Sequence, residues 1–532
     1  MRKPSPPATA RRVTLLRLPR LLLLLGASAL LLWLAAGADS PWCLDNGLRQ
    51  LAASSAAPTV DLGAVVNTAG GAPVFPDRVA RTVFPVVEPF VHWQEGRPLL
   101  VFPALWQTLL WAFARLGALG PPLLMLLCGL LLAWAARRFL RREGADAQLW
   151  LAGLLASPVL FYLGTNWELP LAAALLLLLL QERRDPLPAA LSIAYGLLPW
   201  LRPELALPWL GGLFLLQGWR RRALSLVGFA AGTLLNRSLT DSWLWLQVLQ
   251  NDFQDWSPWR NLAQFWLPAA AGPWLWTGLV LLALLLWAHG RGGARERLAT
   301  WLLWGAFAVA YAVTQTRGAE PLLPCWGALL TAPLAVAMLG RLLCREEWRG
   351  SGPEATLLLA FLLVVSVASP LSRGFHWGPR LLVPALLPLG LWFVTREPAG
   401  WPRRLALGLA LGAQAISLLL LGGRRQLVAA QDEALAGLRA PAVVTSEFYL
   451  LGDHPQLARG RLCYLPWGEL PARALVEGLR GHGVAEIDLL CPPGHPLPVF
   501  LERQLELCPL APPLPLPGGR LGHAMEWRRL GL

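Results

Sequence analysis

Residues 21–37 read LLLLLGASALLLWLAAG, an uncharged apolar run about as long as the hydrocarbon core of a bilayer requires. Residues 1–20 hold six basic residues and no acidic one. Positive charge ahead of an apolar run keeps that end in the cytoplasm, so we predict a first helix with a cytoplasmic N-terminus. A signal peptide cleaved at the Ala-rich end is the alternative, and the many later apolar runs favour an uncleaved helix.

The composition extends this interpretation to the whole chain. Of 532 residues, 55% are hydrophobic and 15% are charged, with a mean hydropathy of +0.48, whereas soluble domains carry about 25% charged residues. The net charge of +14 comes from arginines in short clusters between apolar runs. This is the positive-inside pattern of an integral membrane protein, and it argues against nucleic acid as a partner.

Further apolar runs follow at intervals, with arginine clusters after alternate ones. With the first helix they predict about thirteen transmembrane helices, an odd number that places the C-terminal segment outside the cytoplasm. We therefore expect a multi-pass protein of the inner, or plasma, membrane. The later runs lie near residues 121–136, 148–164, 169–181, 186–201, 203–218, 223–236, 273–289, 299–314, 321–340, 354–370, 381–395 and 404–421.

Residues 38–120 are predicted to form a large outer loop. The Trp-containing run Leu99–Gly117 closes it. If this run crossed the membrane, the basic cluster Arg137–Arg142 would face outward, against the charge rule, so we expect a juxtamembrane helix.

Residues 424–532 differ from the rest of the chain. They are polar and Pro-rich, with short β-type runs such as Ala442–Thr445 and Ile487–Leu490 between helical patterns. That alternation predicts a small extracytoplasmic α/β domain. The expected fold is thus an α-helical polytopic membrane domain, residues 1–423, followed by an α/β domain, residues 424–532.

Two acids are the main catalytic candidates. Asp45, in Leu44-Asp45-Asn46-Gly47, follows the first helix on the outer side, where a carboxylate can act as a general base or bind a metal. The ordinary alternative is a solvated loop acid. Glu168 lies in a short turn between two apolar runs, and its alternative role is to cap the next helix. Glu88 and Glu95, in the outer loop, are secondary candidates.

Basic residues on the same side suit a phosphate. Arg380 begins an apolar run on the outer side, against the charge rule, and its guanidinium matches phosphate oxygens. Arg373 and His376 precede it, and Arg202 lies at another outer turn, where it could pair with Glu204 instead. The alternative for Arg380 is contact with lipid headgroups.

Three stretches carry a family resemblance. Asp45–Ala52 (DNGLRQLA), Glu95–Pro103 (EGRPLLVFP) and Gly378–Pro384 (GPRLLVP), together with the predicted topology, resemble GT-C membrane glycosyltransferases of the protein O-mannosyltransferase and aminoarabinose transferase group. The resemblance implies transfer of a sugar from a polyprenyl-phosphate donor to an acceptor on the outer face, with inversion at the anomeric carbon.

The resemblance also implies residue roles. Asp45 corresponds to the catalytic acid of the first loop, and Glu168 to a second outer acid. Asn46 stands where many members have the second acid of an Asp-Glu pair, so the resemblance does not decide whether a divalent metal is needed. It also does not define the sugar or the acceptor, which can be a lipid, a glycan or a protein.

Two other functions compete with this one. A transporter or flippase of lipid-linked sugars would often show inverted repeats and charges at mid-membrane, but the chain has no evident repeat and its candidate residues gather at one face. A non-catalytic membrane scaffold is the third alternative. The sequence favours the glycosyltransferase.

Overall fold

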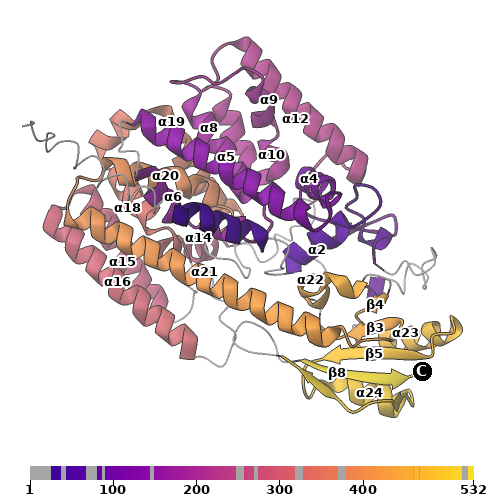
Figure 1. Ribbon diagram of the computed structural model, residues 1–532. Helices are drawn as coiled ribbons and strands as arrows, with labels where there is room; N and C mark the ends of the chain where they lie inside the picture. The colour runs from indigo at the N-terminus through magenta and orange to yellow at the C-terminus, as the bar shows by residue number, and fades with distance from the viewer. Residues whose placement is uncertain are drawn as a thin grey trace, which may run out of the picture.

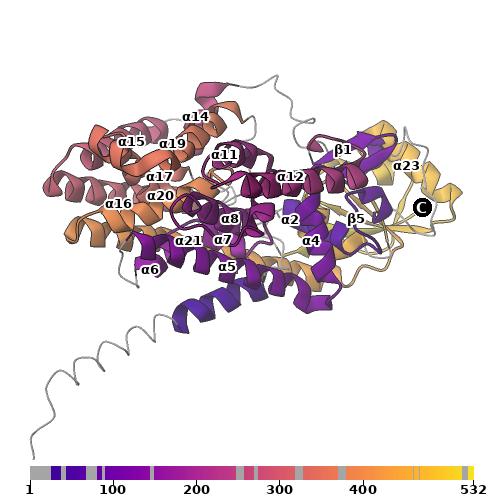
Figure 2. The same ribbon diagram turned by 90° about the horizontal axis from the view of Figure 1, so that it is seen from above.

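The computed structural model combines a large helical part with a small mixed sheet (Figure 1). In Figure 2, the sheet and its helices lie at one end of the molecule and the helices α15 and α16 at the other. The structure describes residues 25–37, 44–66, 81–86, 90–143, 149–246, 257–268, 273–317, 327–369, 379–447, 449–458, 461–466, 468–517 and 525–532.

Most helices of the helical part fall on the predicted apolar runs, and α14 lies between two of them. The helices of this part are Leu25–Ala36, α4 (Ala104–Ala114), α5 (Gly120–Arg142), α6 (Leu149–Leu155), α7 (Val159–Leu163), α8 (Leu169–Gln181), α9 (Leu191–Gly196), α10 (Leu198–Leu201), α11 (Ala206–Gly212), α12 (Trp219–Thr240), α14 (Pro258–Trp266), α15 (Pro273–Gly290), α16 (Ala294–Arg317), α17 (Ala328–Thr331), α18 (Pro333–Leu342), α19 (Arg345–Ala368), α20 (Val383–Arg396) and α21 (Trp401–Leu435).

Several runs expected as single helices are broken. The run 148–164 divides into α6 and α7 at Pro158, and the run 186–201 divides into α9 and α10 just before Pro199. Proline has no N–H for the helical ladder, so a helix tends to restart with it in the first turn. Among the described residues, three helices are long and apolar enough to cross a membrane, namely Gly117–Arg141, Ala294–Thr314 and Trp401–Leu435. The number of spans stays a prediction.

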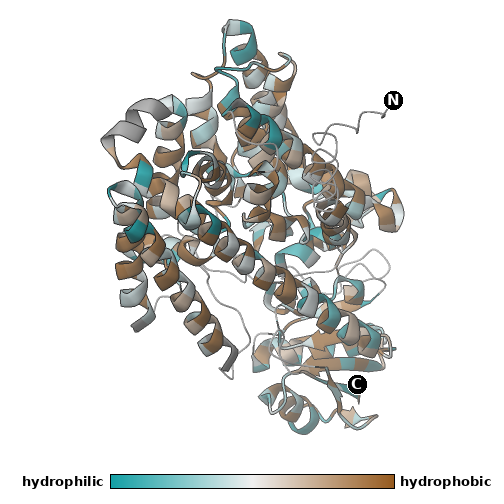
Figure 3. Ribbon diagram, turned by 60° about the vertical axis from the view of Figure 1, so that its left-hand side comes forward, coloured by the Kyte–Doolittle hydropathy of each residue, from teal (hydrophilic) through white to brown (hydrophobic). Residues whose placement is uncertain are grey.

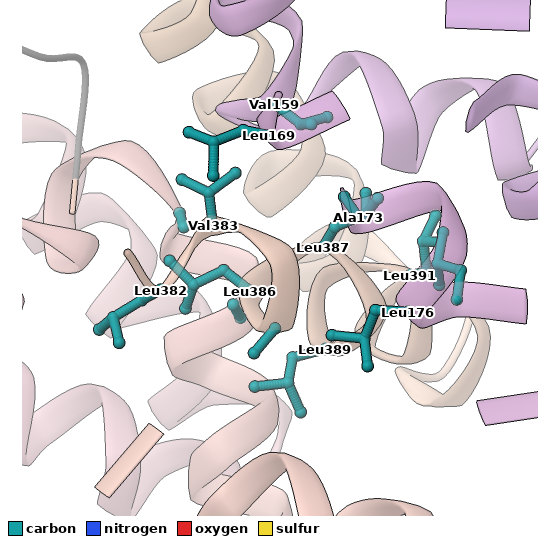
Figure 4. Close-up of a cluster of buried hydrophobic side chains, with 14 of the residues drawn as sticks. Val159, Leu169, Ala173, Leu176, Leu382, Val383, Leu386, Leu387, Leu389 and Leu391 are labelled. Atoms are coloured by element: carbon teal, nitrogen blue, oxygen red, sulfur yellow. The ribbon is translucent and has the colours of Figure 1, made fainter. Parts of the chain in front are cut away.

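Helix α8 forms the centre of the helical part. Every residue of α8 except Leu171 is buried, as expected for a helix that is apolar on all sides. Its Leu169, Ala173 and Leu176 lie near side chains of α20 in the main core (Figure 4). The outer helices instead expose apolar side chains, such as Leu226 of α12, Val280 of α15 and Leu303 of α16. Hydrophobic residues colour much of the helical ribbon brown in Figure 3. Such extensive exposed apolar surface is typical of helices that face lipid.

The sheet occupies the last part of the chain. Its strands are β3 (Ala442–Thr445), β4 (Leu462–Tyr464), β5 (Glu486–Cys491), β6 (Cys508–Pro509), β7 (Leu514–Leu516) and β8 (Met525–Gly531). The order is β4-β3-β5-β8-β6, with β7 also paired to β8. The β3–β4 and β3–β5 pairs are parallel and the pairs of β8 are antiparallel. Helices α22 (Leu450–Asp453), α23 (Glu469–Gly481) and α24 (Pro496–Gln504) connect the strands.

The predicted domain boundary at residue 424 falls inside a helix. α21 continues through this position to Leu435 and leads towards the sheet (Figure 1). Its Arg425 donates hydrogen bonds to the carbonyl oxygens of Leu34 (3.1 Å) and Gly164 (2.8 Å), which join the first helix and the α7–α8 turn to α21. The division into two domains, and the side of the membrane on which the sheet lies, stay predictions.

The predicted outer loop contains folded elements. They are α2 (Leu44–Ala53), a 3-10 turn η1 (Leu62–Ala64), strands β1 (Val91–Gln94) and β2 (Arg97–Leu100), and α4. In α2, Leu48, Leu51 and Ala52 are buried in a core that also contains Leu450 and Leu451 of α22. The two helices touch closely, since a Cβ added to Gly47 would lie 1.7 Å from the carbonyl oxygen of Gly452. The first loop and the end of the chain therefore share one core.

Candidate active site

Four segments that are distant in the sequence bring charged side chains together at the N-terminal end of α8. They are α2, the turn between α7 and α8, the α10–η3 junction, where η3 is Pro203–Leu205, and the turn before α20. The cluster contains as many arginines as acids, so its formal charges cancel. We call it the charged cluster, and it consists of Asp45, Arg49, Glu168, Arg202, Glu204 and Arg380.

Glu168 lies at the centre of the charged cluster. It is completely buried, and its carboxylate oxygens accept from Nη1 of Arg49 at 2.5 Å and from Nη1 of Arg202 at 2.8 Å. Burial by itself raises the pKa of this carboxyl group, but the two guanidinium groups outweigh burial and hold the pKa below its ordinary value. Glu168 therefore stays ionised and aligns both arginines.

Local sequence explains the position of Arg202. The residue before a proline avoids the helical conformation, and Arg202, which precedes Pro203, is extended (φ −154°, ψ 124°) between α10 and η3. Its side chain is buried, with Nη1 on Glu168 and Nε on Glu204. Two acids thus occupy the guanidinium of Arg202.

Asp45 and Arg380 form the more accessible pair. Asp45 lies in the first turn of α2, where the helix dipole favours an acid. Its Oδ2 accepts from Nη1 of Arg380 at 2.9 Å. The Arg380 side chain is 15% exposed, against 3% for Arg202. Of the cluster's arginines, Arg380 is therefore the best placed to meet a ligand.

Trp167 joins these pairs into one unit. The guanidinium carbons of Arg49, Arg380 and Arg202 lie 4.5, 5.1 and 5.9 Å from the centre of its ring. A desolvated cation near an indole ring gains about 2 kcal/mol, and Trp167 is buried. One aromatic ring therefore contacts every arginine of the charged cluster.

Hydrogen bonds fix the turn that carries Trp167 and Glu168. Trp106 Nε1 donates to the carbonyl oxygen of Asn166 at 3.1 Å, and Asn46 Nδ2 donates to that of Thr165. Asn166 has φ 56°, a conformation that asparagine tolerates better than most residues. Its buried amide nitrogen and oxygen have no hydrogen-bond partner among the described residues. This orphaned amide is the kind of group that a polar ligand or water would satisfy.

Comparison with known proteins adds one similarity. No protein-family model matches the sequence, and no curated protein matches it. A solved structure similar to this chain is that of ArnT from Cupriavidus metallidurans bound to undecaprenyl phosphate. The match covers 96% of this chain and 97% of that one, with a TM-score of 0.43 and 13% sequence identity. So distant a similarity leaves the function to be argued from the residues of the charged cluster.

The structure brings together four of the residues singled out from the sequence: Asp45, Glu168, Arg202 and Arg380. Asp45 is not the solvated loop acid of the ordinary alternative, because it is buried in a helix. Whether these residues are catalytic stays a prediction.

Glu95 lies apart from the charged cluster. It is exposed at the tip of the β1–β2 hairpin, where Glu95 and Gly96 both have positive φ, as a tight two-residue turn requires. Glu88, Arg373 and His376 lie outside the described residues.

Sequence reasoning overlooked Arg49 and Trp167. Arg49 follows Asp45 by four residues, so both lie on one face of α2, and this spacing was the signal that could have revealed it. Trp167 adjoins Glu168 directly, but nothing in the sequence indicates that three arginines surround it.

The acids of the charged cluster do not resemble a set of metal ligands. Each of Asp45, Glu168 and Glu204 faces a guanidinium group. Within the described ranges, no three His, Cys, Asp or Glu residues gather in a way that could hold a metal ion. The arrangement suits an anionic ligand held by arginine better than a cation held by carboxylates, so we assign no step to a metal.

Proposed function

We propose that this chain is a membrane glycosyltransferase that moves a sugar from a polyprenyl-phosphate carrier to an acceptor at the outer face of the membrane. The observation that carries the proposal is the 2.9 Å contact between Arg380 and Asp45. It sets a phosphate-binding group beside a candidate base. The donor class is the one that the sequence resemblance implies.

The proposed reaction is a direct displacement. Asp45 takes the proton from an acceptor hydroxyl or amine, whose oxygen or nitrogen forms a bond to the anomeric carbon as the bond from that carbon to the phosphate oxygen breaks. The electron pair leaves with the polyprenyl phosphate, and the anomeric centre inverts. Asp45 ends protonated and releases its proton to solvent.

Arg380 stabilises the charge that develops on the leaving phosphate. Arg380 contacts Asp45 through Nη1, and its side chain is 15% exposed, so in this proposal its guanidinium, a group with five N–H donors, also meets the phosphate oxygens. Charge-assisted donors that are fixed before the reaction are among the strongest contributors to transition-state stabilisation. Arg202, whose side chain is 3% exposed and paired with Glu168 and Glu204, is less accessible for this role.

Glu168, Arg49 and Trp167 act as positioning residues in this proposal. Glu168 fixes the guanidinium of Arg49, and Arg49 belongs to the same helix as Asp45. Trp167 contacts both Arg49 and Arg380. The base and the phosphate-binding group are thus held at a set distance.

The test uses the full chain, purified into lipid nanodiscs, with radiolabelled polyprenyl-phosphate sugars and a membrane extract as acceptor source. Asp45→Asn removes the base with little change in shape, and we expect transfer to fall by about 10²–10⁴-fold. Glu95→Gln is the matched control, because Glu95 is an exposed acid outside the charged cluster, and it should transfer at the wild-type rate.

Equal transfer by wild type and Asp45→Asn would remove Asp45 from the mechanism. A second assay separates the transporter alternative. In sealed vesicles, movement of the labelled lipid across the bilayer without formation of a glycosylated product would contradict the proposal.

A further inference from the structure

A basic pocket lies at the opposite end of α8 from the charged cluster. Its volume is about 550 Å³, and it lies where the end of α5 meets the turn that follows α8. Because α8 has 13 residues and rises about 1.5 Å per residue, the two ends are separated by about 20 Å. We call it the arginine pocket, and its lining residues are Trp134, Arg137, Arg138, Arg141, Arg184 and Asp185.

Two of the four arginines are neutralised. Arg138 forms an ion pair with Asp185 at 2.6 Å, and Arg184 lies 3.7 Å from Glu354. Arg137 and Arg141 are exposed, and they have no ion-pair or hydrogen-bond partner in the part of the chain that the structure describes. The lining residues therefore carry an excess of positive charge, four arginines against Asp185.

An exposed apolar stripe on α5 leads to these two arginines. Leu123, Leu127, Leu130 and Trp134 are 38% to 52% exposed. Their spacing of four, three and four residues continues to Arg137 and Arg141 at three and four residues more. On a helix such spacing follows one face, so the face is first apolar, then aromatic, then basic.

This order matches the layers of half a bilayer. Leucines suit acyl chains, tryptophan is enriched at the boundary with the headgroups, and arginines suit the phosphates beyond it. The positive-inside rule alone explains arginines on this face. It does not explain a pocket that is lined from both α5 and the α8 turn. Trp134 belongs to this lining, and the centre of its ring lies 5.9 Å from the guanidinium carbon of Arg138.

We propose that the arginine pocket binds the phosphate-bearing headgroup of an anionic phospholipid, whose acyl chains lie along the leucine stripe of α5. Arg137 and Arg141 supply the excess positive charge, and the ion-paired Arg138 and Asp185 line the same pocket. The site is separate from the charged cluster and does not depend on the proposed reaction.

The test measures lipid retention by the full chain. The protein is reconstituted in nanodiscs of mixed phosphatidylglycerol and phosphatidylcholine, extracted in mild detergent, and the retained lipids are counted by native mass spectrometry. We expect retention of phosphatidylglycerol about tenfold above phosphatidylcholine. In the double variant Arg137→Gln/Arg141→Gln this preference should disappear.

The control variant is Arg220→Gln/Arg404→Gln, which removes two exposed arginines that do not line the pocket. It should keep the preference. Because all four side chains are exposed, both variants should fold, and the melting temperature of each checks this. A lipid count without headgroup preference in the wild type, or an equal loss in both double variants, would overturn the proposal.

Inorganic phosphate distinguishes a lipid-binding site from a simple anion site, because both would bind phosphate oxygens. We expect 10–50 mM inorganic phosphate to leave the retained lipid unchanged, since the stripe adds acyl contacts that the ion lacks. Displacement of phosphatidylglycerol by phosphate at these concentrations would show a simple anion site and would contradict the assignment to a lipid.

Discussion

The two ends of α8 use arginine in opposite ways. At the N-terminal end, three arginines meet three acids in the charged cluster, drawn from four distant segments and nearly all buried. At the C-terminal end, four arginines and one acid line the arginine pocket, and two of those arginines belong to no ion pair among the described residues. Arginines are balanced by acids at one end of α8 and outnumber the acids at the other.

This difference bears on the role of each arginine. A buried arginine without an acid would cost several kcal/mol, so the matched arginines of the charged cluster must be assembled together or not at all. An exposed arginine carries no such penalty and remains available for an anion. Burial and pairing therefore separate the groups that organise the site from the groups that can recruit a ligand.

In the charged cluster, Asp45→Asn should have the largest effect, a loss of about 10²–10⁴-fold in the rate of sugar transfer. It changes the charge balance of the cluster by one unit but keeps the shape of the side chain. If it also unfolded the protein, its effect on transfer would say nothing of a base, so the melting temperature is measured beside the rate.

Acid removal at each end of α8 gives the sharpest comparison. Glu168→Ala leaves Arg49 and Arg202 buried without their shared partner, and we expect a loss of about 3–5 kcal/mol in the free energy of unfolding. Asp185→Ala removes the acid of the arginine pocket, which is 52% exposed, and should cost about 0–1 kcal/mol. Denaturant titration in detergent compares the two variants, and equal losses would erase the distinction drawn between the two ends.

Arg380→Lys tests the accessible arginine. Lysine keeps the charge but cannot hold Asp45 and a phosphate through separate edges of one planar group. Loss of a charge-assisted hydrogen bond costs about 1.5–3 kcal/mol, which corresponds to about 10- to 160-fold weaker donor binding. Titration of the polyprenyl-phosphate sugar measures this, with Arg404→Lys as the exposed control. A larger effect on the acceptor than on the donor would contradict the phosphate-binding role.

Acid pH should affect the charged cluster through Glu168. The pKa of Glu168 is lowered in the folded protein, so the stability it contributes is fully present above its unfolded pKa of about 4.3 and is lost as pH falls through the folded pKa. The melting temperature of the wild type should therefore drop more steeply below about pH 4 than that of Glu168→Gln. Parallel curves for the two proteins would show that Glu168 does not titrate in this way.

The sequence predicted the helical part of the fold from apolar runs and arginine spacing, but it did not predict where the runs break. Hydropathy does not register that Pro158 and Pro199 interrupt the hydrogen-bond ladder, although the prolines themselves were visible. The strands β3 and β5 lie where the sequence showed short β-type runs. The strands β6 and β7 are too short, and too rich in proline, to give such a pattern.

For the candidate site, the sequence could indicate residues but not partners. Asp45, Glu168 and Arg380 were visible as charges beside apolar runs. That Arg380 meets Asp45, 335 positions away, follows from helix packing, which no local pattern encodes. Arg202 was predicted as a phosphate ligand or as the partner of Glu204. The structure has it paired with Glu204 and also with Glu168.

The contact between Gly47 and Gly452 has a consequence for how the protein is made. Helix α2, which carries Asp45 and Arg49, packs against α22 so tightly that a single methyl group at Gly47 would collide with the backbone of Gly452. Roughly 400 residues separate the two glycines, which at about 5–20 residues per second takes a ribosome about 20–80 s. During that time α22 is not yet available to pack against α2. The packing of α2 is thus completed only after Gly452 has been made, and a chain that stops before α22 would carry every residue of the charged cluster without the packing that holds the helix of Asp45 in place.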